Sequence, residues 1–129
     1  MKSSRTCILL LLGTAFQIAC GNSNMTTRRL QTLSVNPAVA NPSAGQSVQF
    51  AATGTFNTQP SPATVTPSQW YESQSDGQPS SAGIVSVDQN GVAHCQASGT
   101  SWVGAMASSG PDMPATSTFV RGTAQMNCP

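Results

Sequence analysis

Hydrophobic residues in this chain recur mostly at alternate positions, and the clearest run spans residues 47–53. Val48, Phe50 and Ala52 share one face of an extended chain there, and the other face is largely polar. A period of two with one polar face predicts a half-buried strand in an antiparallel sheet. Alternating or short β-favouring runs predict further strands at residues 30–35, 69–72, 84–89, 92–95, 100–107 and 116–125.

Stretches that disfavour strands separate these runs. Residues 57–67 contain three prolines, which have no N–H for a sheet ladder, and residues 73–83 are rich in Ser and Gln, so both are predicted loops. Asn90-Gly91 predicts a tight hairpin in which both residues adopt positive φ. About seven short strands, with turns at regular intervals and no run of helical period, predict an all-β sandwich.

The first 19 residues differ from the rest of the chain. A positive start with Lys2 and Arg5 precedes an apolar run at 7–12 and then small residues, which is the order of a secretory signal. A helix over residues 7–19 would span roughly 20 Å, less than the ~30 Å hydrocarbon core of a bilayer. We therefore expect a cleaved signal and no permanent transmembrane helix.

The end of this leader, IACGN at residues 18–22, resembles the lipobox of bacterial lipoproteins, although Gln17 stands where that family usually has Leu. The resemblance implies that Cys20 begins the mature chain and carries the acyl groups that hold it to a membrane, with delivery to the outer membrane or cell surface. Residues 20–29 would then form a flexible tether. The alternative is an ordinary signal cut after Ala15, which would leave Cys20 as a free thiol.

If the leader is a lipoprotein signal, each of the four cysteines can be assigned a role. Cys7 leaves with the signal and Cys20 takes the lipid, so Cys95 and Cys128 remain as a pair in an oxidising compartment. We predict that they form a disulfide, worth roughly 3–4 kcal/mol in the chain-entropy model. A metal site at His94 and Cys95 is the rival, but one histidine and two thiols are too few for a closed zinc shell.

Charge is sparse beyond the leader. From Cys20 onward, three arginines stand against four acidic residues, a net charge of −1. Nucleic-acid binding needs many cations that displace counterions, so we expect no nucleic-acid partner. About 110 mature residues suffice for one domain, which we expect to be monomeric.

Catalytic and metal-binding patterns are sparse. His94 is the only histidine and lies within a predicted strand, which does not suit an acyl-transfer triad. Asp88 is followed by hairpin residues, without the further carboxylates that a calcium loop needs. We therefore predict no enzyme, no metal and no cofactor. The acidic residues are Glu72, Asp76, Asp88 and Asp112.

A second resemblance is carried by the order and spacing of residues 33–37, 45–54, Trp70, 85–93 and 99–105. Over nearly all of residues 30–129, the mature chain resembles a bacterial immunoglobulin-like domain of group 2. This resemblance implies an immunoglobulin-like β-sandwich of about seven antiparallel strands, in which Trp70 packs between the sheets. It also implies a structural, adhesive or partner-binding role for one lipid-anchored domain of the cell envelope.

Two aromatic residues suggest an alternative function. If Val103 and Ala105 face the core, Trp102 points outward, and Tyr71 lies on the face opposite to Trp70. Exposed rings of this kind could stack on sugars in a small carbohydrate-binding module, whereas the simpler interpretation is that Trp102 covers one end of the sandwich. A third hypothesis is an envelope protein partner that pairs with the strand edge at 116–125.

Overall fold

The structure, a computed structural model, describes residues 26–110 and 118–129. The predicted leader at 1–19, the predicted lipid-bearing Cys20, Asp112 and the start of the strand expected at 116–125 lie outside these ranges. Within the described residues, all regular secondary structure is β, in ten strands. The predicted all-β class is confirmed.

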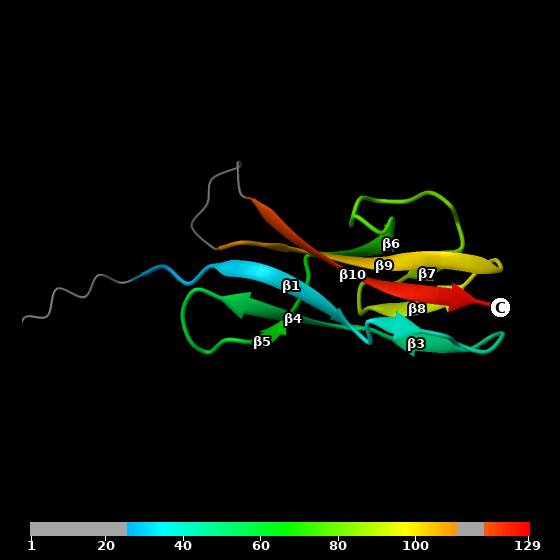
Figure 1. Ribbon diagram of the computed structural model, residues 1–129, viewed down its shortest axis with the longest axis horizontal. Helices are drawn as coiled ribbons and strands as arrows, with labels where there is room; N and C mark the ends of the chain where they lie inside the picture. Colours follow the sequence, from blue (N-terminus) through cyan, green and yellow to red (C-terminus); the bar gives the residue numbers. More distant parts are fainter. Residues whose placement is uncertain (1–25, 111–117) are drawn as a thin grey trace, which may run out of the picture.

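The strands form two packed layers (Figure 1). One layer is a four-stranded sheet in the order β6-β9-β10-β2, and the other consists of two short sheets, β1-β4-β5 and β3-β8-β7. The strand bounds are Leu30–Asn36 for β1, Val39–Ala40 for β2, Ser47–Gln49 for β3, Ala51–Phe56 for β4, Ala63–Val65 for β5, Gln69–Ser73 for β6, Val85–Val87 for β7, Val92–Cys95 for β8, Gly99–Ser108 for β9 and Phe119–Cys128 for β10.

The strand order is that of an immunoglobulin-like sandwich. β6, β9 and β10 follow one another across the first layer, as strands C, F and G do in that fold. In the second layer, β1 pairs with β4, and β3 pairs with β8, which pairs with β7. Because β3 and β4 are successive parts of one strand, this layer has the order A-B-E-D. β2 and β5 are additions to this plan.

Alternation along the strands builds the core between the layers. Val103 and Ala105 of β9 are fully buried, which meets the condition under which Trp102 points outward, and the large side chains of Phe50 and Trp70 are 1% and 5% exposed. Ala124 lies opposite Val103, so small residues on the middle strands leave room for these rings. The alternation in both layers therefore places large rings and small side chains together in one interior.

Two sequence predictions for the second layer need correction. The strand predicted at 47–53 is divided at Phe50, because β3 pairs with β8 whereas β4 pairs with β1 and β5. The predicted loop at 57–67 contains strand β5. Its three residues contain no proline, so they can pair along the edge of β4 even though prolines flank them.

The hairpin at Asn90-Gly91 forms, but its turn differs from the predicted one. Gly91 has a φ of 80°, whereas no residue other than glycine has positive φ in the described chain. The Gly91 N–H donates to the Asp88 carbonyl oxygen, and the Asp88 N–H donates to Val92. This is the three-residue loop that ends in a left-handed glycine. The Asp88 carboxylate favours it, because Oδ1 accepts N–H groups from Asn90 and Val92.

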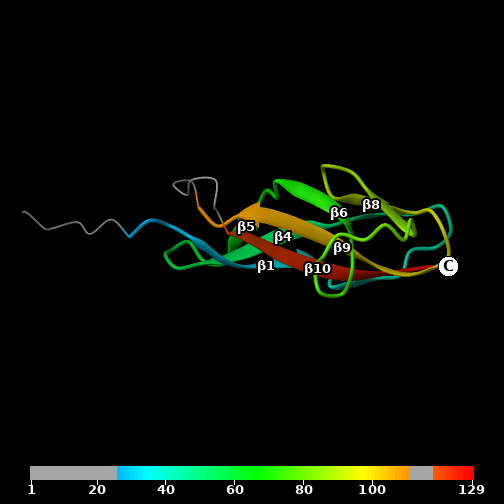
Figure 2. The same cartoon turned by 90° about the horizontal axis from the view of Figure 1, so that it is seen from above.

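A disulfide joins the two layers at one end of the sandwich. Cys95 closes β8 and Cys128 closes β10, with 5.6 Å between their Cα atoms. The predicted pairing is therefore confirmed. The C-terminus lies at this end, whereas the chain enters β1 at the opposite end (Figures 1 and 2).

Candidate binding surface

The outward face of the β6-β9-β10-β2 sheet carries both aromatic residues of the carbohydrate hypothesis. On β9, Trp102 points away from the core, as expected from the inward Val103, and it is partly exposed. Tyr71 of β6 lies on the same outward face, opposite Gly104 of β9. The surroundings of these two rings divide the face into two halves.

The half around Tyr71 is covered by the loop that follows β6. The Tyr71 ring lies over Gly104, where a Cβ atom would come within 2.6 Å of Tyr71 Cε2. The Tyr71 hydroxyl donates to the Gly77 carbonyl oxygen at 2.8 Å. Gly77 is itself buried, next to the side chains of Thr123 and Arg121. We call Tyr71, Gly104, Thr123 and Arg121, with residues 74–79 above them, the covered half.

Burial in this half raises the pKa of the Tyr71 phenol, and the positive charge of Arg121 opposes the rise. The hydrogen bond to Gly77 also requires the phenol to keep its proton. Tyr71 therefore acts in this arrangement as a neutral donor that holds the loop.

The loop is ordered by its own hydrogen bonds. The Gln74 N–H donates to the Gln78 carbonyl, and the Ser80 N–H donates to the Glu72 carbonyl. The Asp76 carboxylate accepts the Gln78 N–H at 3.0 Å. Asp76 thus has a turn-forming role of the kind that the sequence indicated.

Glu72 fixes the far end of the loop, a role that the sequence analysis missed. Its carboxylate accepts N–H groups from Gly83, Ile84 and Val85 and the hydroxyl of Ser101, all between 2.8 and 3.1 Å. Burial acts to raise the pKa of Glu72, but these four donors together lower it. Glu72 therefore binds β6 to the start of β7 and to β9 as a carboxylate.

The other half of the face, around Trp102, lies beside the loop and carries amide side chains. Gln125 of β10 lies directly opposite Trp102. Because the Gln125 N–H donates to Ala38, away from β9, the Trp102–Gln125 pair is of the non-hydrogen-bonded type, in which side chains are closest. We call Trp102, Thr100, Gln125, Asn127, Asn41 and Val39 the open half.

Hydrogen bonds connect the amides of the open half. Gln125 Nε2 donates to Asn127 Oδ1 at 2.9 Å, and Thr100 Oγ1 donates to the same oxygen at 3.0 Å. Asn127 Nδ2 donates to Asn41 Oδ1 at 2.7 Å. The open half is thus a preformed row of uncharged polar groups beside an indole ring, suited to ligands rich in hydroxyl groups.

The described surface also has two hollows. One, of about 290 Å³, is lined by residues of β3, β4 and β5 and of the β7–β8 hairpin. Gln49, Thr64 and Asn90 are among them. The Gln49 side chain already donates to the carbonyls of Phe50 and Asn90. The other, of about 200 Å³, lies beside Cys95 and Pro129. Neither hollow gathers groups with evident reactive chemistry.

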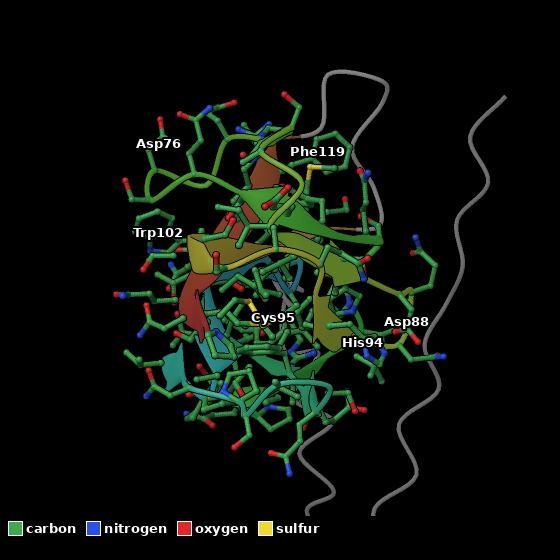
Figure 3. The ribbon with its side chains drawn as sticks, turned by 90° about the vertical axis from the view of Figure 1, so that its right-hand side faces the viewer. Asp76, Asp88, His94, Cys95, Trp102 and Phe119 are labelled. Carbon is green, nitrogen blue, oxygen red and sulfur yellow. A yellow bond between two sulfur atoms is a disulfide. The ribbon has the colours of Figure 1, made fainter. Side chains whose placement is uncertain are left out.

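His94 and Asp88 lie on the other side of the sandwich from Trp102 (Figure 3). His94 is exposed on β8 opposite Ser47 and Ser86, so it shares the face of Ser86 and not of Val87. Within residues 26–110 and 118–129, no three His, Cys, Asp or Glu residues are close enough to hold a metal ion.

The strand edge at 116–125 is partly occupied where the structure describes it. β2 runs parallel to β10 at Gln125 and Met126. Nearer the start of β10, the backbone of β1 lies so close that a Cβ atom on Gly122 would overlap the Leu33 carbonyl oxygen. β2 therefore occupies the edge at Gln125 and Met126, whereas the contact at Gly122 lies on the inward face of β10.

No protein-family model matches this chain, and no curated protein matches it. In the part of the chain that the structure describes, no helix has the length and apolar character to cross a membrane.

Proposed function

We propose that this chain is a lipid-anchored protein of the cell envelope that displays one immunoglobulin-like β-sandwich. Its role is structural, adhesive or partner-binding, without catalysis. The acyl groups on Cys20 attach it to the membrane, residues 20–29 form the tether, and the domain stands as a monomer at the outer membrane or cell surface.

The path of the chain is the observation that carries this proposal. The tether would join the sandwich at the start of β1, and the disulfide and C-terminus lie at the opposite end (Figure 1). A lipid at Cys20 would therefore hold one end near the bilayer. The other end, which includes Thr100 and Asn127 of the open half, would project away from it.

Membrane fractionation and palmitate labelling test the anchor. We expect the wild-type chain in the membrane fraction with label incorporated, and we expect Cys20→Ala to lose both. Cys7→Ala is the matched control, since this cysteine would leave with the signal. Equal release of the wild type and Cys20→Ala into the soluble fraction would refute the anchor, and so would label that persists in Cys20→Ala.

A further inference from the structure

We infer that the open half binds an uncharged polysaccharide, with Trp102 as the stacking ring and Gln125, Asn127 and Asn41 as the hydrogen-bonding row. This inference rests on the partner-binding role proposed above, but it does not depend on the lipid anchor. It names the ligand class and assigns the surface to residues outside the covered half.

Charge selects the class of ligand. The open half contains no Asp, Glu, Lys or Arg. Glu72 is engaged on the inward side, where it accepts four hydrogen bonds, and Arg121 belongs to the covered half, where the stem of its side chain lies near Gly77. No residue of the open half would pair with a phosphate or carboxylate of a ligand, whereas a neutral polyol needs no such partner.

The amide row offers both donors and acceptors in fixed positions. Asn127 accepts from Gln125 and Thr100 and donates to Asn41, so the three amides constrain one another. Within the described chain, Gln125 Oε1 and Asn41 Nδ2 make no hydrogen bond, so one acceptor and one donor remain for a ligand. Groups held in place before binding lose less conformational entropy when a ligand arrives.

Trp102 supplies the apolar part of the surface. Its indole is partly exposed on a strand that is rigid because both neighbours, β6 and β10, pair with it. An aromatic ring of this kind adds large contact area at low entropic cost and suits the C–H face of a sugar. Val39, which is 52% exposed and lies opposite Gln125, extends the apolar area along the row.

Native affinity electrophoresis of the full chain in mild detergent tests the inference. The gels contain β-glucan, xylan or galactomannan as neutral probes and alginate as an acidic one. We expect at least one neutral polysaccharide to retard the wild type. Trp102→Ala should weaken that retardation about tenfold or more, Trp102→Phe should restore part of it, and Gln125→Ala should weaken it less.

Phe119→Ala is the matched control, because Phe119 is also an exposed aromatic on this outward face, 52% exposed, at the other end of β10. It should leave retardation unchanged. The inference is overturned if no neutral polysaccharide retards the wild type, if alginate alone does so, or if Phe119→Ala weakens binding as much as Trp102→Ala.

Folding of each variant is checked by near-ultraviolet circular dichroism. If Trp102→Ala does not fold, the binding of Gln125→Ala and Asn41→Ala tests the inference, because both variants change only polar side chains on the outward face. The outcome of this experiment can also be distinguished from the outcome of the anchor test. Membrane retention without polysaccharide binding would refute this inference alone, whereas binding by a protein released from membranes would refute only the anchor.

Discussion

The covered and open halves of the outward face belong to the same sheet but present different surfaces. In both, β9 and β10 alternate inward and outward with unbroken register. The difference is the loop after β6, which packs Gly77 over Tyr71 and Thr123, whereas the half around Trp102 carries connected amide side chains. Strand alternation decides which residues point outward, and tertiary contacts then decide which of them the loop binds.

Loss of the disulfide should have the largest effect on stability of the changes considered. The disulfide also lies next to the open half, because Cys128 is the neighbour of Asn127. Replacing both Cys95 and Cys128 by Ser should lower the free energy of unfolding by about 2–5 kcal/mol. Urea unfolding of the double variant measures it. If the open half depends on the disulfide, polysaccharide retardation should fall with it, whereas hydrogen exchange in residues 74–79 should change little. A loss below 1 kcal/mol would contradict this role.

Gly104→Val tests the packing of the covered half. The new Cβ would meet Tyr71 Cε2 at 2.6 Å and Ser73 Cβ at 2.9 Å, so the ring must move and release the loop. We expect a loss of about 1–3 kcal/mol in urea unfolding, as for other overpacked sites. Gly110→Ala is the control, because its Cβ would meet nothing closer than 3.8 Å. Equal stability of Gly104→Val and wild type would show that the ring does not fill this space.

Glu72→Gln tests the far end of the loop. The variant loses charge-assisted hydrogen bonds from the 83–85 backbone, and we expect about 1–2 kcal/mol less stability at pH 7 because the carboxylate is partly exposed to solvent. Asp76→Asn, whose carboxylate accepts one turn N–H from Gln78, should cost less.

The pH dependence of Glu72 follows from its lowered pKa. The folded protein favours the Glu72 carboxylate. The contribution of Glu72 to the free energy of unfolding is therefore complete above the ordinary pKa of 4.5, and it is lost as pH falls through the lower pKa of the folded state. The stability difference between wild type and Glu72→Gln should therefore shrink between pH 6 and pH 2. A difference that grows on acidification would contradict the assignment.

Tyr71→Phe is expected to have the smallest effect, about 0.5–1.5 kcal/mol, because one hydrogen bond to the Gly77 carbonyl is lost. Amide exchange should accelerate in residues 74–79 and remain unchanged at Trp102. Tyr71 is the only tyrosine, so absorbance also reports its titration. Its pKa should lie above the ordinary 10.0 in the folded protein, with stability lost as pH rises through that region. A normal pKa would place the ring in solvent.

The sequence predicted the candidate surface only in part. Outward placement of Trp102 was predicted on the condition that Val103 and Ala105 face the core, because a strand has a fixed period of two. Gln125 and Asn127 were not recognised, although they lie in or next to a predicted strand. Their position beside Trp102 depends on the register between β9 and β10, and the connection between these strands does not fix that register through a short turn.

By itself, the sequence determined the all-β class, most of the strands and the cysteine pair. These follow from local chemistry, namely side-chain alternation, proline and glycine positions, and the count of thiols. Only the tertiary structure decided that the strand at 47–53 divides between two sheets, that Glu72 accepts four hydrogen bonds, and that the loop after β6 binds the Tyr71 hydroxyl. Those outcomes depend on backbone groups from distant segments that meet when the layers pack, and no local pattern specifies such meetings.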